Sequence, residues 1–248
     1  MRAGCERAAD LDLIVWSADL DSPDDRWMSG LCDADEFARA ERLPDALGAA
    51  RYLRHRGWLR VLLARRLTCA PADVVVRRTT AGRPFVPGSN LRITAAHSRG
   101  IGLYATATEG ALGVDLEWQE PDLRWPAILR AFGTSLECRA VTADAERRGV
   151  VAFYDWWCRK EAILKARGTG LSESLSAIPV LDGRQEMVNA GVHGAWSLRT
   201  LAARPGFSAA LAWSSRSDWV PDDIVPVFPA TAEIGIPTAQ EPLDCRRL

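Results

Sequence analysis

The two lysines of this chain lie within one six-residue stretch, at Lys160 and Lys165. The chain has 31 basic side chains, and all the others are arginine. Lysine differs from arginine in carrying a compact ammonium group whose pKa its surroundings readily shift. Glu161 precedes Lys165 by four residues, which makes the two side chains neighbours on one face of a helix. One explanation of this pattern is codon bias together with an ordinary solvated helix face. A Glu–Lys pair at this spacing stabilises a helix by only about 0.2–0.5 kcal/mol, however, so stability alone is a poor explanation of its placement. We therefore favour a pair of groups used in chemistry.

Two acids lie on one face of an expected strand over residues 111–118. Side chains alternate between the two faces of a strand, so Asp115 and Glu117 share one face. Two carboxylates about 7 Å apart repel each other unless a cation lies between them. Mg²⁺ is a natural candidate because it takes oxygen ligands from carboxylates and from substrate phosphates. The D-x-E pattern is common, however, and an exposed strand face with two unpaired acids explains it equally well.

A third group of polar residues follows an expected short strand. His97 and Ser98 come just before a glycine turn, where connecting segments often carry binding groups. Arg83 lies upstream in a Gly-Arg-Pro turn. A lone histidine is more often structural than functional, so both interpretations of His97 stay open at this point. The other two histidines, His55 and His193, have no such neighbours, and we expect them on the surface.

The elements that must position these residues alternate between helices and strands. Strands are predicted over residues 11–20 and 91–96, and strands over 101–108 and 111–118 are predicted to form a hairpin across Glu109-Gly110. Hydrophobic periodicity predicts helices over residues 33–44, 46–67, 123–132, 135–148 and 150–167, the last of them ending at Gly168.

A weak internal repeat indicates two similar α/β halves. The run over residues 91–96 resembles the run over 198–203, and a glycine turn and an alanine-rich strand follow each of them. We therefore expect an N-terminal half over residues 1–118, a C-terminal half over 119–220 and a proline-rich tail over 221–248.

Composition and charge narrow the class of protein. At 248 residues, with 48% apolar and 25% charged residues, the chain is typical of soluble globular proteins. A formal net charge of -1 gives no indication of a nucleic-acid or membrane partner. Six scattered cysteines without a C-x-x-C pair fit reduced thiols better than a zinc site or a disulfide scaffold. We find no signal peptide or membrane span, and expect a cytoplasmic protein.

The motifs together resemble one enzyme family. In chain order they are G-R-P (82–84), A-H-S (96–98), G-V-D-L-E (113–117) and W-C-R-K-E-A-I-L-K (157–165). This order resembles the 4′-phosphopantetheinyl transferases, specifically the large, surfactin-synthetase-activating class. That family has a G-K-P turn, an S-H-S segment, a G-[VI]-D-[VIL]-E strand and a W-x-x-K-E-[AS]-x-x-K helix. The last two motifs match throughout, and residues 168–171 resemble the glycine-containing segment that follows the helix.

The resemblance implies a fold and an activity. Members of the family move the phosphopantetheine arm of coenzyme A onto a serine of an apo acyl or peptidyl carrier protein, releasing adenosine 3′,5′-bisphosphate. The implied fold is a pseudo-dimer of two α/β halves with the site in the cleft between them, so we expect a monomer. Asp115, Glu117 and Glu161 would bind Mg²⁺, while Glu161 and Lys165 would act on the serine proton and the departing phosphate. The implied coenzyme A contacts are Arg39, Arg42, Arg51, Arg83, His97, Ser98, Lys160 and Lys165.

Two other classes of function remain open. One is another Mg²⁺-dependent phosphotransferase or nucleotidyl transferase, although no P-loop or kinase signature occurs. The other is a non-catalytic coenzyme A or carrier-protein binding module, although the acids and Lys165 are all present. Ala96 stands where the family has serine, which removes one hydroxyl contact to a phosphate. The carrier is not indicated, although arginine-rich composition suggests a high-GC genome, and such genomes often encode polyketide and nonribosomal-peptide synthases. Oxygen ligands suit Mg²⁺ and Mn²⁺ alike.

Overall fold

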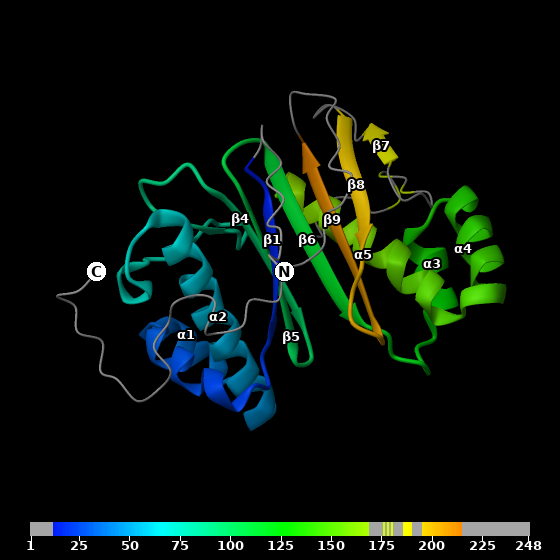
Figure 1. Cartoon of the computed structure of the whole chain (residues 1–248). Coiled ribbons are helices and arrows are strands. Elements are labelled where there is room, and N and C mark those ends of the chain that lie inside the picture. The colour runs from blue at the N-terminus through cyan, green and yellow to red at the C-terminus, as the bar shows by residue number, and fades with distance from the viewer. Residues whose placement is uncertain are drawn as a thin grey trace, which may run out of the picture.

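In a computed structural model of the chain, antiparallel sheets lie between two groups of helices (Figure 1). The structure describes residues 12–168, 176, 178, 180, 186–189 and 195–214. The expected proline-rich tail over 221–248, residues 169–171 of the glycine-containing segment and His193 lie outside these residues. The mixture of helices and strands confirms the expected α/β class.

The first half builds a three-stranded sheet with α2 on one face. Its strands are β1 (Ile14–Asp19), β4 (Arg92–Ser98) and β5 (Ile101–Ala107), in the order β1-β5-β4 and all antiparallel. The helices between β1 and β4 are η1 (Pro23–Leu31), α1 (Ala34–Ala40), α2 (Ala46–Leu67) and η2 (Pro71–Asp73). A separate two-stranded sheet pairs β2 (Arg77–Arg78) with β3 (Pro84–Phe85).

The second half builds a four-stranded sheet covered by α5. Its strands are β6 (Ala111–Trp118), β7 (Glu186–Asn189), β8 (Ala195–Leu201) and β9 (Phe207–Ser214), in the order β6-β9-β8-β7. Its helices are α3 (Trp125–Phe132), α4 (Ser135–Arg148) and α5 (Val150–Arg167). Gly168 ends α5 in the left-handed conformation with φ of 72°, as the sequence predicts.

The two halves repeat one topology. In each half, the first strand is followed by helices and then by a hairpin, and it pairs antiparallel with the last strand of that hairpin. The orders β1-β5-β4 and β6-β9-β8 are therefore equivalent. This repeat supports two similar halves, and it begins at β6. The expected boundary after residue 118 leaves β6 in the first half, whereas β6 hydrogen-bonds to a strand of the second.

The hairpin predicted across Glu109-Gly110 is wrong. Both edges of β5 are already occupied, by β1 on one side and β4 on the other, so β6 pairs with β9 instead. The connection passes against the end of β9, where a Cβ added at Gly110 would overlap the Ser214 carbonyl oxygen. Glu109-Gly110 is thus a crossing between sheets, which local turn chemistry does not distinguish from a hairpin loop.

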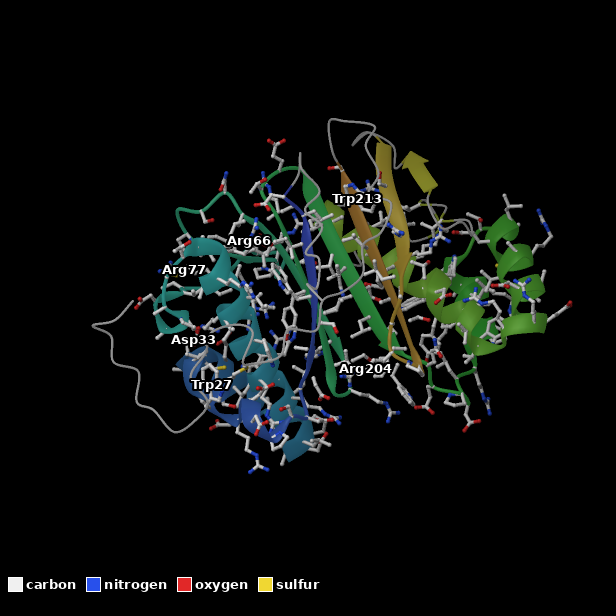
Figure 2. All side chains as sticks on the ribbon, viewed as in Figure 1. Trp27, Asp33, Arg66, Arg77, Arg204 and Trp213 are labelled. Atoms are coloured by element: carbon white, nitrogen blue, oxygen red, sulfur yellow. The ribbon has the colours of Figure 1, made fainter. Side chains whose placement is uncertain are left out.

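Three apolar clusters hold the layers together. One lies between α2 and the first sheet and another between α5 and the second sheet. The third joins the two sheets, with Val15, Leu103, Val114 and Leu211 among its buried members. Trp213 belongs to this central cluster and is almost fully buried (Figure 2). The acids of β6 therefore face α5, on the opposite side of the strand from the central cluster.

Arginines in the two hairpin turns each reach across to the other half. Arg99, between β4 and β5, pairs with Glu120 at 2.9 Å and lies 4.8 Å above the ring centre of Trp118. Arg204, between β8 and β9, pairs with Asp19 of β1 at 3.2 Å (Figure 2). The two halves are thus tied together at the same ends of their sheets. No helix among the described residues is long and apolar enough to cross a membrane.

Candidate active site

Strand β6 presents its acids directly beneath α5. Leu112, Val114 and Leu116 are buried in the central cluster, so the alternation of the strand turns Asp115 and Glu117 toward the helix. A Cβ added at Gly113, two residues before Asp115 on the same face of the strand, would overlap the Ala162 carbonyl of α5. Glycine thereby permits the close approach of strand and helix that brings the acids under α5.

Lys165 of α5 reaches down to the strand and pairs with Asp115. Its Nζ lies 2.6 Å from Asp115 Oδ1, and Asp115 is only 3% exposed. Desolvation opposes the charge on Lys165, but attraction by Asp115 and then Glu161 outweighs it and raises the pKa of the lysine. Lys165 is therefore a permanent cation at neutral pH, and it is half-buried.

The negative charge of the carboxyls around Lys165 is only partly balanced by that lysine. Burial first, and then the negative charge of Asp115, raises the pKa of Glu117 to about 7. The same two causes raise the pKa of Glu161, against the opposing effect of Lys165. Asp115 Oδ2 is buried and makes no hydrogen bond within the described part of the chain. One lysine thus does not neutralise three acids, and a further positive charge would stabilise their ionised forms.

The carboxylate oxygens of the three acids are of the type that binds divalent cations, although the structure does not gather them around one point. Mg²⁺ or Mn²⁺ would use three carboxylates such as these, one of which has a buried oxygen without a hydrogen-bond partner in the described residues. Within the described residues, however, no group of three potential ligands lies close enough to share a metal ion. The expected ligands Asp115, Glu117 and Glu161 therefore interact electrostatically across the β6–α5 gap, and their joint coordination stays a prediction.

The end of β4 joins the first half to this site. Ser98 donates a long hydrogen bond to Glu117 Oε2 at 3.4 Å and accepts one from the Trp118 amide at 2.9 Å. His97 precedes it and is exposed. Lys165 contributes to lowering the pKa of His97, after the larger effect of desolvation. The A-H-S and G-V-D-L-E motifs are therefore neighbours, as the family resemblance implies.

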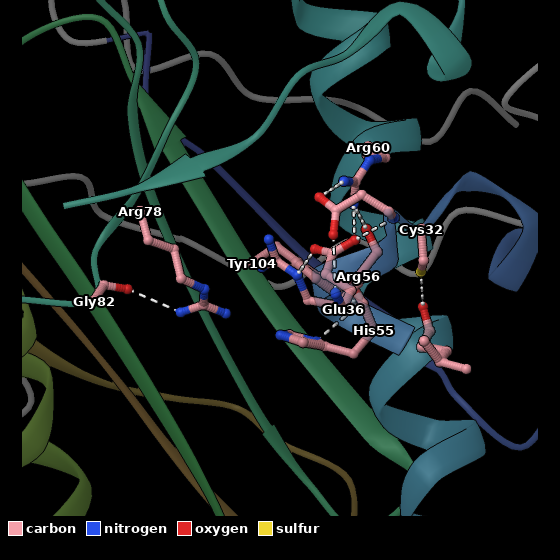
Figure 3. A network of polar contacts seen from close by, with 10 residues as sticks. Cys32, Glu36, His55, Arg56, Arg60, Arg78, Gly82 and Tyr104 are labelled. Carbon is pink, nitrogen blue, oxygen red and sulfur yellow. Dashed lines mark hydrogen bonds and ion pairs between the residues drawn. The ribbon is translucent and has the colours of Figure 1, made fainter. Parts of the chain in front are cut away.

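His55 is the clearest error of the sequence interpretation. It is buried at 7% exposure on α2, where Figure 3 shows it beside Tyr104 and the Glu36–Arg56 network. Its ring lies 4.5 Å from that of His97. The periodicity of α2 could have revealed this position, because His55 is three residues from Tyr52 and four from Leu59 on the buried stripe.

Two expected coenzyme A contacts have structural partners. Arg83 Nη2 donates to the carbonyls of Leu112, Lys165 and Ala166, so it holds the end of α5 against β6. Lys160 is fully buried and pairs with Glu137 at 2.9 Å. Lys160 therefore points away from the acids of the site, and the proposed function does not include it as a contact.

The basic residues of the first helices take separate positions. Arg51 makes a two-point ion pair with Asp21, with Nη2 to Oδ2 at 2.6 Å. Arg39 lies 5.9 Å from the ring centre of Tyr52, and Arg42 is exposed. These arginines stay predicted phosphate contacts.

The chain is similar in sequence to a known family and to several of its members. The sequence profile of the 4′-phosphopantetheinyl transferase superfamily matches residues 111–212. The 4′-phosphopantetheinyl transferase AcpT of Salmonella typhi is 35% identical over 134 residues, which are 52% of this chain and 68% of AcpT. A Synechocystis protein provisionally named as such a transferase is 31% identical over 167 residues, 66% of this chain and 68% of that protein. The 4′-phosphopantetheinyl transferase HetI of Nostoc is 27% identical over 207 residues, 81% of this chain and 87% of HetI.

The chain belongs to the 4′-phosphopantetheinyl transferase superfamily. This membership confirms the family expected from the motifs. In this phosphopantetheinyl transferase, the matched region runs from β6 to β9 and contains Asp115, Glu117, Glu161 and Lys165. His97 and the arginines of the first half lie outside it. Of these residues, Arg83 contacts the end of α5, and His97 adjoins Ser98, which donates to Glu117.

Proposed function

We propose that this enzyme transfers the 4′-phosphopantetheine group of coenzyme A to a serine of an apo carrier protein, as a member of the large, surfactin-synthetase-activating class. One observation carries the proposal: Asp115, Glu117 and Glu161 surround Lys165 between β6 and α5 with an excess of negative charge. A pyrophosphate ester needs cationic groups to bind and to leave, and an acid-rich site supplies them by holding a divalent cation.

The three acids are the proposed holders of Mg²⁺ or Mn²⁺. Such an ion, when bound, supplies positive charge to the pyrophosphate oxygens. Phosphoryl transfer depends mainly on positioning and on charge neutralisation, so the chain itself has few further tasks. Lys165, which pairs with Asp115 in the free protein, is the proposed cation for the departing phosphate.

Glu161 is the proposed proton acceptor. In the balanced step, the serine oxygen forms a bond to the phosphorus that carries pantetheine, and the bond from that phosphorus to adenosine 3′,5′-bisphosphate breaks. The serine proton goes to Glu161, whose pKa is raised by burial and by Asp115.

The first half supplies the proposed contacts to the 3′-phosphate. His97 and Ser98 lie at the end of β4, next to β6. Arg51 uses Nε and Nη2 for Asp21 and keeps other N–H groups for a phosphate. Arg83, Arg39 and Arg42 are further proposed contacts, and Arg83 has the least freedom because it also binds the end of α5.

An apolar surface on α3 and α4 suits a protein substrate. Phe132 and Leu136 are 40% and 51% exposed, and the Phe132 ring contacts Trp157 of α5 at 5.9 Å. Trp157 is one helical turn before Glu161, so this surface leads directly to the site. Exposed arginines flank it at Arg124, Arg130 and Arg139, with no exposed acid between residues 123 and 143. We propose that it receives an acidic carrier helix beside the reactive serine.

Transfer is tested by mass spectrometry of the carrier. The purified enzyme is incubated with coenzyme A, Mg²⁺ and apo carriers of the fatty-acid, polyketide and nonribosomal-peptide types, including one with an acidic serine-bearing helix. We expect a mass gain of one phosphopantetheine group, lost with Glu161→Gln and kept with Glu109→Gln, a loop glutamate away from the site. No mass gain on any carrier contradicts transferase activity, and binding of coenzyme A without transfer indicates a binding module instead.

A further inference from the structure

A buried pair of rings supports His97 from below. His97 is the residue before the last one of β4 and is exposed, whereas His55 beneath it is buried on α2. Their ring centres are 4.5 Å apart at an interplanar angle of 64°, an edge-to-face contact. His55 in turn stacks on Tyr104 of β5 at 4.9 Å, and Tyr104 is 1% exposed. The exposed histidine therefore rests on a column of two buried aromatic side chains.

The Tyr104 hydroxyl locks the orientation of His55 (Figure 3). It lies 2.9 Å from His55 Nδ1 and donates to the His55 carbonyl oxygen at 3.2 Å. A tyrosine hydroxyl has one proton, so when it donates to the carbonyl, the ring Nδ1–H must donate to it. This assignment fixes both the tautomer and the rotation of the His55 ring. A fixed His55 ring limits the orientations that His97 can take against it.

Gly102 makes this column possible. It pairs with His97 in the β4–β5 register, and a Cβ added there would lie 2.5 Å from the Tyr104 hydroxyl oxygen. The tyrosine ring occupies the space that any other residue at position 102 would fill. Gly102, Tyr104, His55 and His97 thus interlock, and none of the first three touches the acids of the site in the described contacts.

Ring orientation matters because the surroundings of His97 favour the neutral form of its imidazole in the free protein. Desolvation against its neighbours lowers the pKa of His97, and Lys165 of α5 and Arg56 of α2 lower it further, against a backbone hydrogen bond that raises it. Burial lowers the pKa of His55 well below its usual value, with His97, Arg56, Arg78 of β2 and Lys165 acting in the same direction. A neutral imidazole has one N–H donor, so it binds a phosphate only when that N–H faces the phosphate.

We propose that His55 and Tyr104 are positioning residues that orient His97 toward the 3′-phosphate of coenzyme A. This inference rests on the proposed function, which assigns His97 to that phosphate. His55 and Tyr104 do not contact the substrate. They act by holding the ring that does, and their contribution should be confined to the phosphate that His97 binds.

The test compares two ligands that differ only in that phosphate. Dissociation constants for coenzyme A and 3′-dephospho-coenzyme A are measured by calorimetry on the intact chain, without carrier. We expect Tyr104→Phe to weaken coenzyme A binding about 3- to 10-fold, the effect of one hydrogen bond, and to leave 3′-dephospho-coenzyme A binding unchanged. In the His97→Ala background the same substitution should have no further effect.

Matched variants separate positioning from stability. Tyr154→Phe also removes one buried hydroxyl, which accepts from the Glu120 amide, and should leave the ratio of the two dissociation constants unchanged. His55→Phe keeps an aromatic ring, although a larger one, removes Nδ1 and should match Tyr104→Phe; it serves also if the latter fails to fold. With only three histidines, the His97 imidazole resonances can be followed by NMR, and should shift in both variants.

The outcomes distinguish this inference from the proposed function. If His97→Ala weakens coenzyme A binding but Tyr104→Phe and His55→Phe do not, the positioning role is overturned and the phosphate assignment stands. Equal weakening of both ligands by Tyr104→Phe also overturns it, since that result indicates general damage to the site. If the unaltered protein binds both ligands equally, the assignment of His97 to the 3′-phosphate fails, and this inference fails with it.

Discussion

The equivalent strands β1 and β6 carry opposite kinds of residue under equivalent helices. Asp19 and Trp118 occupy the same register position, because each pairs with the first residue of the last strand in its half. The strands can therefore be compared residue by residue. Residue types that the two strands share are explained by the common fold, and residue types found only in β6 are explained by the site.

By this register, Trp16 of β1 corresponds to Asp115 of β6, and Ala18 corresponds to Glu117. Trp16 and Ala18 are buried in the apolar cluster under α2. Asp115 and Glu117 instead place two acids under α5, and each of them raises the energy of the other in its charged form. The fold therefore does not need acids at these positions. Their presence in one half only indicates a functional requirement that costs stability.

Removing one acid of β6 should strongly lower the activity, and this is the largest expected effect. Asp115→Asn should lower kcat/KM for coenzyme A by about 10³-fold, or about 4 kcal/mol of transition-state stabilisation, because the cation loses a ligand and Lys165 loses its partner. Asp19→Asn removes an acid from the equivalent strand of the first half and should leave kcat/KM within about twofold. Similar losses in both variants would remove the distinction between the halves.

The halves also share a buried ion pair, with a different cation in each. A capping-box glutamate begins the helix before each long helix: Glu36 on α1 and Glu137 on α4. Glu36 pairs with Arg56 and Arg60 of α2, whereas Glu137 pairs with Lys160 of α5. The Lys160 ammonium also donates to the Ile178 carbonyl at 2.6 Å. A compact ammonium suits this enclosed position better than a planar guanidinium.

Breaking the two ion pairs should therefore have unequal effects on stability. Lys160→Met leaves Glu137 buried without its cation and should cost about 3–5 kcal/mol of unfolding free energy, measured by urea denaturation. Arg60→Met should cost less, because Arg56 still pairs with Glu36. Arg204→Ala, which removes an exposed pair, should cost about 1 kcal/mol or less. Equal costs for Lys160→Met and Arg204→Ala would contradict the structural role of Lys160.

The acids of β6 should also make stability depend on pH. The pKa of Glu117 is raised to about 7, mainly by burial. A carboxyl with a raised folded-state pKa stabilises the fold below its unfolded pKa, and this contribution is lost as pH rises through the folded value. Without divalent cation, stability should fall between about pH 5 and 8, by up to about 1.4 kcal/mol per pH unit from this group. Glu117→Gln should flatten urea-denaturation midpoints over this range, and an unchanged slope would contradict the assignment.

Local patterns were sufficient to predict most elements and the acids of the site. Strict alternation predicted β6 over residues 111–118, and periodicity with Gly168 predicted α5 over 150–167, both with their observed bounds. Pairing between distant strands was not predictable in this way. The hairpin across Glu109-Gly110 was wrong because β1 and β4 occupy both edges of β5, which no local signal indicates.

Side-chain partners were harder still to predict than pairing. The unusual placement of two lysines suggested a chemical role for both. At about 100° per residue, however, Lys160 and Lys165 are separated by about 140° around the helix, and so point to different sides. Lys160 enters the core toward Glu137, and Lys165 faces Asp115. The burial of His55 depends on Tyr104, 49 residues away, whose ring occupies space left by Gly102.

The most direct test of the account is a count of bound cation. Mn²⁺ binding to the intact chain with coenzyme A present can be followed by electron paramagnetic resonance. We expect one Mn²⁺ per chain, with affinity at least about tenfold lower in each of Asp115→Asn, Glu117→Gln and Glu161→Gln, as expected when a metal ligand is lost. Unchanged affinity in Glu161→Gln would contradict it, because the strand and helix acids would then not share one ion.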